Sequence, residues 1–111
     1  MRAAEAVDVL AASAVTHPKT SQAVKKASAS GTPVFAILND FAPNECHGYI
    51  GLDNYRAGRV AGWLLANAIR KSGSVAVVVG GNLWQGHQLR ESGLRAYFRE
   101  NTVPKKFETR C

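Results

Sequence analysis

The sequence has 111 residues, a formal net charge of +6 and a hydrophobic content of 46%. This composition is typical of a globular chain, and it excludes a collagen-like repeat, a coiled coil, a disulfide-rich scaffold and a disordered tract. The uncharged apolar runs are far shorter than the roughly 20 residues that cross a membrane, so we expect no membrane span. The length allows one small domain or a piece of a larger one.

The first half of the chain predicts strands and a helix in alternation. Val7–Val15 is rich in Val, Leu and Ala, which predicts a buried strand. A helix begins at Pro18, because the N–H that proline lacks would be unbonded at the first helical position, and it ends at Gly31. Two further apolar runs, Pro33–Leu38 and Gly48–Leu52, predict two more buried strands.

The second half continues the alternation. Asp53 or Asn54 caps a helix that runs to about Lys71. The apolar stripe expected on this helix consists of Ala57, Val60, Ala61, Leu64 and Ala68. Ser74–Val79 is uninterrupted and β-branched, which predicts a strand buried on both faces. The last two expected elements are a helix and a strand, over His87–Glu100 and Lys106–Arg110.

Apolar strands that alternate with helices predict an α/β fold, in which a parallel sheet carries flanking helices. In such sheets, ligands bind beyond the carboxyl ends of the strands. The segments expected at that edge are Val15–His17, Asn39–Asp40, Asp53–Asn54 and Gly80–Gly86.

Positive charge is concentrated in the second half of the chain. Residues 1–55 contain four Lys or Arg and five Asp or Glu, a net charge of −1, whereas residues 56–111 contain ten and three, a net charge of +7. These cations are scattered and no aromatic residues alternate with them. We therefore interpret them as solvated helix faces rather than as a nucleic-acid site.

The two cysteines, Cys46 and Cys111, lie 65 positions apart and form no CxxC or Cys/His pattern. This arrangement predicts no metal site, no redox motif and no cofactor. Two free thiols in a reducing compartment are the simpler interpretation, and one long-range disulfide stays open. The N-terminal residues lack the pattern of a signal peptide, so we expect a cytoplasmic protein.

A glycine-rich segment, Gly80–Gly86, stands between an expected strand and an expected helix. Gly81 and Gly86 have the spacing of a phosphate-binding loop, but His87 and Gln88 replace the lysine and the hydroxyl residue that nucleotide hydrolysis requires. We expect the glycines to permit a tight turn and a close approach of the backbone to a ligand.

Two charged residues at the strand-end edge are candidate ligand contacts. Arg90 presents a planar fork of donors that suits a carboxylate, a phosphate or paired sugar hydroxyls, and the alternative is a surface cation or a partner of Glu91 or Asp53. Asp53 is either the N-cap of its helix or an acceptor for ligand hydroxyls. Both roles are compatible if Asn54 caps the helix instead.

Trp84 lies in an expected turn, where its ring either stacks on a ligand or packs against the protein. His17 and His87 fall on the same edge, and we interpret them as structural hydrogen-bonding groups rather than as metal ligands or general bases. The sequence contains no nucleophile–base pair and no pair of carboxylates at catalytic spacing. We therefore do not expect an enzyme.

Five motifs in order resemble the effector-binding domain of the lactose-repressor-like (LacI/GalR) transcription regulators. The same domain occurs in periplasmic sugar-binding proteins of the type I class. The series covers nearly the whole chain, and its members are Val7–Val15, Gly31–Phe35, Ile50–Asn54 with Ala57 and Gly58, Val75–Gly80, and Arg90 with Gly93.

The resemblance implies which residues contact a ligand. In the family's pattern an acidic residue lies five positions before a helix glycine, which here is Asp53 before Gly58. An arginine lies three positions before a later glycine, which here is Arg90 before Gly93. The other candidates, which match by lying in loops that would face the ligand, are His17, Asn39, Asp40, Asn82 and Trp84.

The resemblance also implies two Rossmann-like α/β lobes that hold a small ligand, often a sugar, between them. Residues 1–72 would be part of the N-terminal lobe and residues 73–111 the start of the C-terminal lobe. The chain would then be the effector-binding portion of a LacI-family regulator, truncated and without the helix-turn-helix. DNA would be bound only through that missing N-terminal domain, and a homodimer would form in the full-length parent.

Three alternatives stay open. A fragment of a periplasmic sugar-binding protein of an ABC transporter would have the same fold and the same ligand class. A non-functional remnant is the second alternative, since the resemblance covers only part of two lobes. A small α/β enzyme is the third, and it is disfavoured because the sequence shows no catalytic set.

Overall fold

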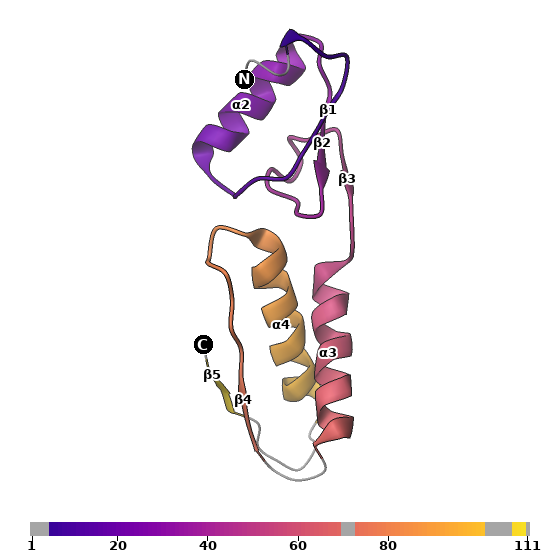
Figure 1. The fold of residues 1–111 in the computed structure, drawn as a ribbon, viewed down its shortest axis with the longest axis vertical. Coiled ribbons are helices and arrows are strands. Elements are labelled where there is room, and N and C mark those ends of the chain that lie inside the picture. The colour runs from indigo at the N-terminus through magenta and orange to yellow at the C-terminus, as the bar shows by residue number, and fades with distance from the viewer. Residues whose placement is uncertain (1–4, 70–72, 102–107, 111) are drawn as a thin grey trace. The chain divides into compact units, whose positions relative to one another are not determined.

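The computed structural model describes residues 5–69, 73–101 and 108–110. Its elements, labelled in Figure 1, are β1 (Leu10–Ala12), α2 (Pro18–Ala29), β2 (Val34–Ile37), β3 (Gly48–Ile50), α3 (Asn54–Ala68), β4 (Ser74–Ala76), α4 (Gln85–Glu100) and β5 (Glu108–Arg110). The chain divides into two compact units. The first comprises the described residues of Met1–Leu52 and Leu83–Gln85, and the second those of Asp53–Asn82 and Gly86–Cys111. None of the described helices is long and apolar enough to cross a membrane.

The first unit contains a parallel sheet in the order β1-β2-β3. Its register places Leu10 of β1 opposite Val34, and Tyr49 of β3 opposite Ala36. Along β2, two fully buried residues alternate with two half-buried ones, as expected when successive side chains point to opposite faces of a sheet. One face of the sheet is therefore tightly packed.

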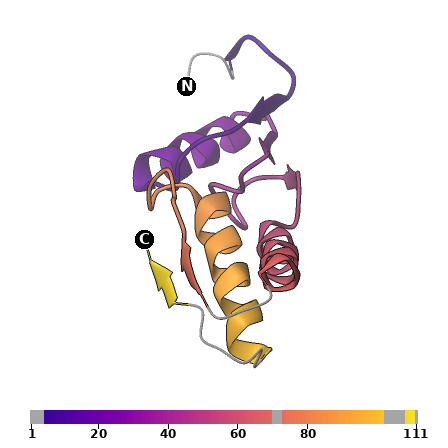
Figure 2. The same ribbon diagram turned by 60° about the horizontal axis from the view of Figure 1, so that its bottom comes forward.

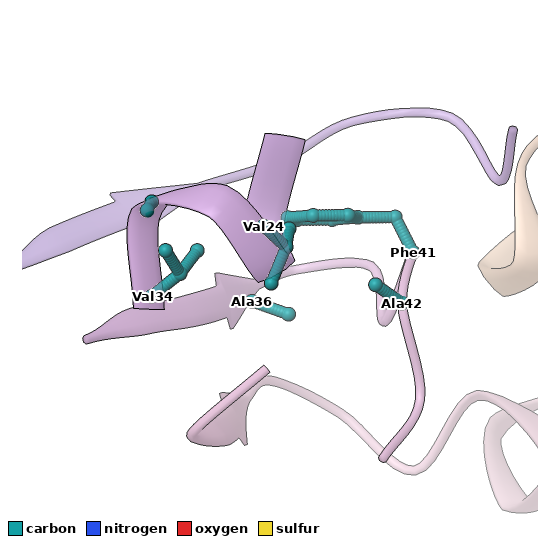
Figure 3. Close-up of a cluster of buried hydrophobic side chains, with 6 residues drawn as sticks. Val24, Val34, Ala36, Phe41 and Ala42 are labelled. Carbon is teal, nitrogen blue, oxygen red and sulfur yellow. The ribbon is translucent and has the colours of Figure 1, made fainter. Parts of the chain in front are cut away.

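Helix α2 packs on that face and closes the core of the first unit. The core cluster consists of Val24, Ala27, Val34, Ala36, Phe41 and Ala42 (Figure 3). None of the six is more than 4% exposed. Full burial of a valine stabilises a fold by about 1.5–3 kcal/mol relative to leaving it in water, so this cluster is the main source of stability in the first unit.

Both predicted ends of α2 are confirmed. His17 is the N-cap, and its Nδ1 accepts a hydrogen bond from the backbone N–H of Lys19 at 3.1 Å. Pro18 occupies the first helical position, and Ser30 caps the other end. Gly31 follows with φ +91°, a left-handed conformation that suits glycine.

Helices α3 and α4 of the second unit run side by side, as Figures 1 and 2 show. Their backbones approach closely at glycines. A methyl group on Gly58 would collide with the backbone carbonyl of Arg90, and one on Gly93 would collide with the carbonyl of Tyr55. At Gly62 it would lie 2.8 Å from a side-chain atom of α4. Glycine is therefore required along this crossing, because any side chain would push the two helices apart.

The second unit also contains a parallel pair of strands, in which Ser74, Val75 and Ala76 of β4 lie opposite Glu108, Thr109 and Arg110 of β5. Strand β5 falls within the predicted strand Lys106–Arg110, whose first two residues lie outside the described part of the chain. The parallel sheets and their helices confirm the predicted α/β fold class.

Several predicted strands are longer than the observed ones. Strand β1 covers only Leu10–Ala12 of the expected Val7–Val15, and β4 ends at Ala76. The predicted burial of this strand on both faces is wrong, because Ser74 and Ala76 are exposed on either side of the buried Val75. Beyond the end of β4, Val78 is 92% exposed. A β-strand is defined by its hydrogen bonds to a neighbouring strand, and β4 pairs with β5 over three residues. The apolar run Ser74–Val79 therefore continues beyond the end of β4.

The predicted apolar stripe on α3 is wrong at three of its positions, because Val60, Leu64 and Ala68 are all exposed. Val60 and Leu64 are each 55% exposed. The buried positions are Asn54, Gly58 and Gly62, which follow one another at intervals of four. The physical reason is the close approach of α4, since the helix face with the smallest residues lets the partner backbone come nearest.

The end of α3 also differs from the prediction. The helix ends at Ala68, and Ile69 has extended backbone angles (φ −100°, ψ 102°). The end was expected near Lys71, which lies outside the described residues.

Candidate ligand-binding site

The N-terminus of α3 positions two adjacent polar side chains. Asp53 is the N-cap, because its Oδ1 accepts a hydrogen bond from the backbone N–H of Arg56 at 3.0 Å. Asn54, the other candidate for the cap, has a different role. It is only 4% exposed and its Oδ1 accepts a hydrogen bond from Nη1 of Arg90 at 2.5 Å.

Arg90 therefore pairs with a neutral amide rather than with either carboxylate suggested by the sequence. Glu91 accepts two hydrogen bonds from the guanidinium of Arg95, at 3.0 and 2.8 Å, and Asp53 accepts from the backbone at its own helix. An amide partner does not neutralise the positive charge of Arg90. A guanidinium carries five N–H donors, so one bond to Asn54 orients the fork without using up its capacity.

A pocket of about 230 Å³ lies between α3, α4 and the segment 77–80. Its polar lining comes from α4 and consists of His87, Arg90 and Glu91. The rest of the lining is apolar and consists of Ala57, Gly58, Ala61, Val77, Val78, Val79, Gly80 and Leu94. Pockets for drug-sized ligands measure about 300–1,000 Å³, so this one suits a compact ligand with a single ring.

The loop between β4 and α4 forms part of this pocket. The backbone N–H of Gly80 donates to Nδ1 of His87 at 3.2 Å, and a methyl group on Gly80 would lie 2.7 Å from the His87 ring. Gly81 has φ +138°, which suits glycine alone. The side chain of Gln88 donates to the backbone carbonyl of Asn82. His87 thus has the structural hydrogen-bonding role that the sequence predicts, and the loop is folded back onto the start of α4.

Three other predicted site residues, His17, Asp40 and Trp84, lie in the first unit. His17 caps α2, as described above. Asp40 is half-buried and follows Asn39, whose Nδ2 donates to the carbonyl of Ala14 at 2.8 Å. Trp84 is half-buried.

The structure joins Asn54 and Arg90 in the second unit, where Asp53 caps α3 and the exposed Asn82 accepts from Gln88 through its backbone carbonyl. The described lining of the pocket includes Arg90 but neither Asp53 nor Asn82.

Cys46 is a free thiol of the first unit. Burial raises the pKa of the Cys46 thiol, and the negative charges of Asp40 and Glu45 raise it further. A protonated thiol is a poor nucleophile. The other cysteine, Cys111, lies outside the described residues. Within the ranges that the structure describes, no group of three His, Cys, Asp or Glu side chains could hold a metal ion.

Sequence reasoning missed Asn54 as the partner of Arg90, and it missed the glycine crossing that brings them together. A signal was present, because Asn54, Gly58 and Gly62 recur at every fourth position and so share one face of the helix. Two glycines on one helix face favour a second helix close to that face.

The sequence model of the periplasmic binding protein domain matches residues 1–109. Nearly all of the chain is covered, and the parallel strands and flanking helices agree with that fold. The chain therefore belongs to the periplasmic binding protein domain family. No curated protein matches the chain.

Solved structures of this fold resemble the chain closely. XylFII is 28% identical with a TM-score of 0.83, and the match covers 99% of this chain and 40% of XylFII. GanP, a glucose-galactose binding protein from Geobacillus stearothermophilus, is 27% identical with a TM-score of 0.81, and the match covers 98% of this chain and 40% of GanP. This chain thus spans about two fifths of the length of these proteins.

A putative LacI transcriptional regulator from Bacteroides fragilis is also similar, with 19% identity and a TM-score of 0.73. The match covers 95% of this chain and 38% of the regulator. Similarity at this level of identity shows the shared fold alone. The type I periplasmic-binding-protein fold suggested by the sequence motifs is thereby confirmed.

Proposed function

We propose that this chain supplies a sugar-binding site of the periplasmic-binding-protein type. The observation that carries the proposal is the hydrogen bond between Arg90 and Asn54 beside the pocket of the second unit. A guanidinium and a carboxamide offer donors and acceptors in fixed directions, which is what neighbouring sugar hydroxyls require. GanP, whose name gives glucose and galactose as its ligands, supports carbohydrate as the ligand class.

Each polar group has a distinct role in this proposal. Arg90 donates to two adjacent ring hydroxyls, and Asn54 keeps the guanidinium in the required orientation. Asp53 accepts a hydrogen bond from a third hydroxyl through Oδ2, while its Oδ1 remains the helix cap. His17, Asp40, Asn82 and Trp84 stay predicted contacts. The chain binds its ligand without reacting with it.

Isothermal titration calorimetry of the 111-residue chain with D-glucose and D-galactose tests this proposal. Arg90→Ala removes the charged donor and should weaken binding by at least about tenfold, because hydrogen bonds to charged groups contribute about 1.5–3 kcal/mol. Arg99→Ala, which removes an exposed arginine outside the pocket lining, should leave the affinity unchanged. Unchanged affinity in Arg90→Ala removes this residue from the site. If the chain binds neither sugar, the proposal is contradicted.

The physiological role has two candidates. The five motifs of the sequence favour the effector-binding part of a cytoplasmic LacI-family regulator, with residues 1–72 and 73–111 in different lobes, a homodimeric parent and DNA bound through a separate domain. The identity of 28% to an ABC transporter solute-binding protein from Burkholderia graminis favours a transport-type binding protein instead. Sequencing the DNA upstream of Met1 separates the two. A helix-turn-helix there supports the regulator, and a signal peptide supports the binding protein. If the upstream DNA encodes neither of them, the result supports a non-functional remnant.

A further inference from the structure

The lining of the pocket in the second unit is polar on one side only. His87, Arg90 and Glu91 are spaced by three and four positions on α4, so they share one helix face. Each of them already takes part in a hydrogen bond that fixes its orientation, His87 with Gly80, Arg90 with Asn54 and Glu91 with Arg95.

The rest of the lining is aliphatic. Besides Gly58, Gly80 and the 92% exposed Val78, it consists of five more protected side chains, Leu94, which is 8% exposed, and the half-buried Val77, Val79, Ala57 and Ala61. None of these five side chains can donate or accept a hydrogen bond. A ligand hydroxyl placed against them would lose its water without gaining a side-chain partner, whereas a methyl group would gain from being removed from water.

We propose, on the basis of the sugar-binding function above, that the ligand is a 6-deoxy sugar. Its methyl group lies against Val77, Val79 and Leu94, and its ring hydroxyls lie toward Arg90. A hexose with a hydroxymethyl group at the same position would bring one hydroxyl to the aliphatic wall. The small volume of the pocket, about 230 Å³, favours a monosaccharide over a longer chain.

Matched pairs of sugars test this inference by calorimetry on the 111-residue chain. The pairs are D-galactose with 6-deoxy-D-galactose, and D-glucose with 6-deoxy-D-glucose, which differ in one hydroxyl. We expect the deoxy member of at least one pair to bind about tenfold tighter, the low end of what a hydrophobic pocket achieves for a single small group. Equal or tighter binding of both parent hexoses overturns this inference and leaves the sugar-binding proposal intact. If none of the four sugars binds, both are overturned.

The same substitution, valine to threonine, at two positions tests where the methyl group of the sugar lies. Val79→Thr keeps the shape of the side chain but places a hydroxyl in the pocket wall. The preference for the deoxy sugar should therefore fall by about threefold or more, which is part of the roughly tenfold preference expected for the parent chain. Val60→Thr makes the same change on α3 at a position that is 55% exposed and outside the lining, and it should leave the preference unchanged. Ala61→Ser repeats the test at the part of the same aliphatic wall that α3 supplies, with circular dichroism to verify folding. An unchanged preference in both wall variants overturns the placement.

Discussion

Arg90 of α4 and Asn54 at the start of α3 are joined by a hydrogen bond of 2.5 Å between Nη1 and Oδ1. The amide is 4% exposed, whereas the arginine also lines the pocket. One interaction therefore links the two helices and orients the only described cation of the pocket lining. The stability of the second unit and the geometry of the proposed site depend on the same pair of side chains.

Asn54→Ala should destabilise the chain and weaken sugar binding together. The substitution leaves Arg90 without its amide partner, and loss of such a bond costs about 1–3 kcal/mol. Urea denaturation measures the loss of stability. Asn67→Ala is the matched control, since Asn67 is exposed on the same helix and its Nδ2 donates a hydrogen bond to the carbonyl of Trp63, one turn earlier. A fall in stability of the same size in both variants would contradict a special role for Asn54.

Gly58→Ala should disrupt the crossing of α3 and α4. In a helix, alanine is more favourable than glycine by about 1 kcal/mol, so at an exposed position this change would increase the stability of the helix. Here the added methyl group meets the backbone carbonyl of Arg90, which cannot rotate away as a side chain could. We expect a net loss of about 1–3 kcal/mol by chemical denaturation, together with weaker ligand binding.

Gly73→Ala is the control for the helix crossing. Its added methyl group would find its nearest neighbour, a methyl carbon of Ile69, at 3.9 Å, which is an ordinary contact. This variant should be close to the parent chain in stability. A Gly58→Ala variant that is as stable as Gly73→Ala would show that the helices can separate without loss.

Glu45 should contribute to stability only above acidic pH. Hydrogen bonds from Ser21 and Lys25 lower the pKa of the Glu45 carboxyl in the folded chain below its usual value of 4.5. Because the folded pKa is the lower one, the contribution is present above pH 4.5 and is lost as the pH falls through the folded pKa.

Urea midpoints measured against pH check this expectation. Glu45→Gln should be less stable than the parent chain at pH 7, and the difference should shrink as the pH falls below about 4.5. The difference should also shrink in high salt, since Lys25 is 68% exposed and its 3.2 Å ion pair with Glu45 is open to screening. Glu5→Gln, at an exposed position, should show neither trend. A constant difference across this pH range would refute the assignment.

Cys46 should react slowly with thiol reagents at neutral pH. Burial and the charges of Asp40 and Glu45 raise the pKa of this thiol, so little thiolate is present. The rate is measured with iodoacetamide in a Cys111→Ser background, so that one thiol reports. Asp40→Asn removes one negative charge and should speed the reaction. A rate equal to that of free cysteine would contradict the raised pKa.

The alternation of elements could be predicted because it depends on local patterns. Pro18 and Gly31 define the ends of α2 through backbone geometry alone, and the apolar runs locate β2 and β3. The length of β4 could not be predicted, since it depends on which residues pair with it from β5, more than 30 positions later.

The part of the candidate site that depends on local sequence patterns could also be predicted. Arg90 and Asp53 stand out by their position near strand ends, and Arg90 does line the pocket. The partner of Arg90 could not be found from spacing, because the sequence suggested the carboxylates of Glu91 and Asp53, whereas Asn54 lies 36 positions away from Arg90. Only the approach of α3 to α4 at Gly58 and Gly93 decides that the amide meets the guanidinium.

Each unit of the chain contains one tryptophan. Trp63 belongs to the second unit and is 51% exposed on α3, whereas Trp84 is half-buried in the short segment that returns to the first unit. That segment is held there by a 2.8 Å hydrogen bond from Thr16 N–H to the carbonyl of Leu83. The variants Trp63→Phe and Trp84→Phe therefore make fluorescence specific to one unit at a time. Two emission curves from one polypeptide reveal whether its halves melt together or in sequence.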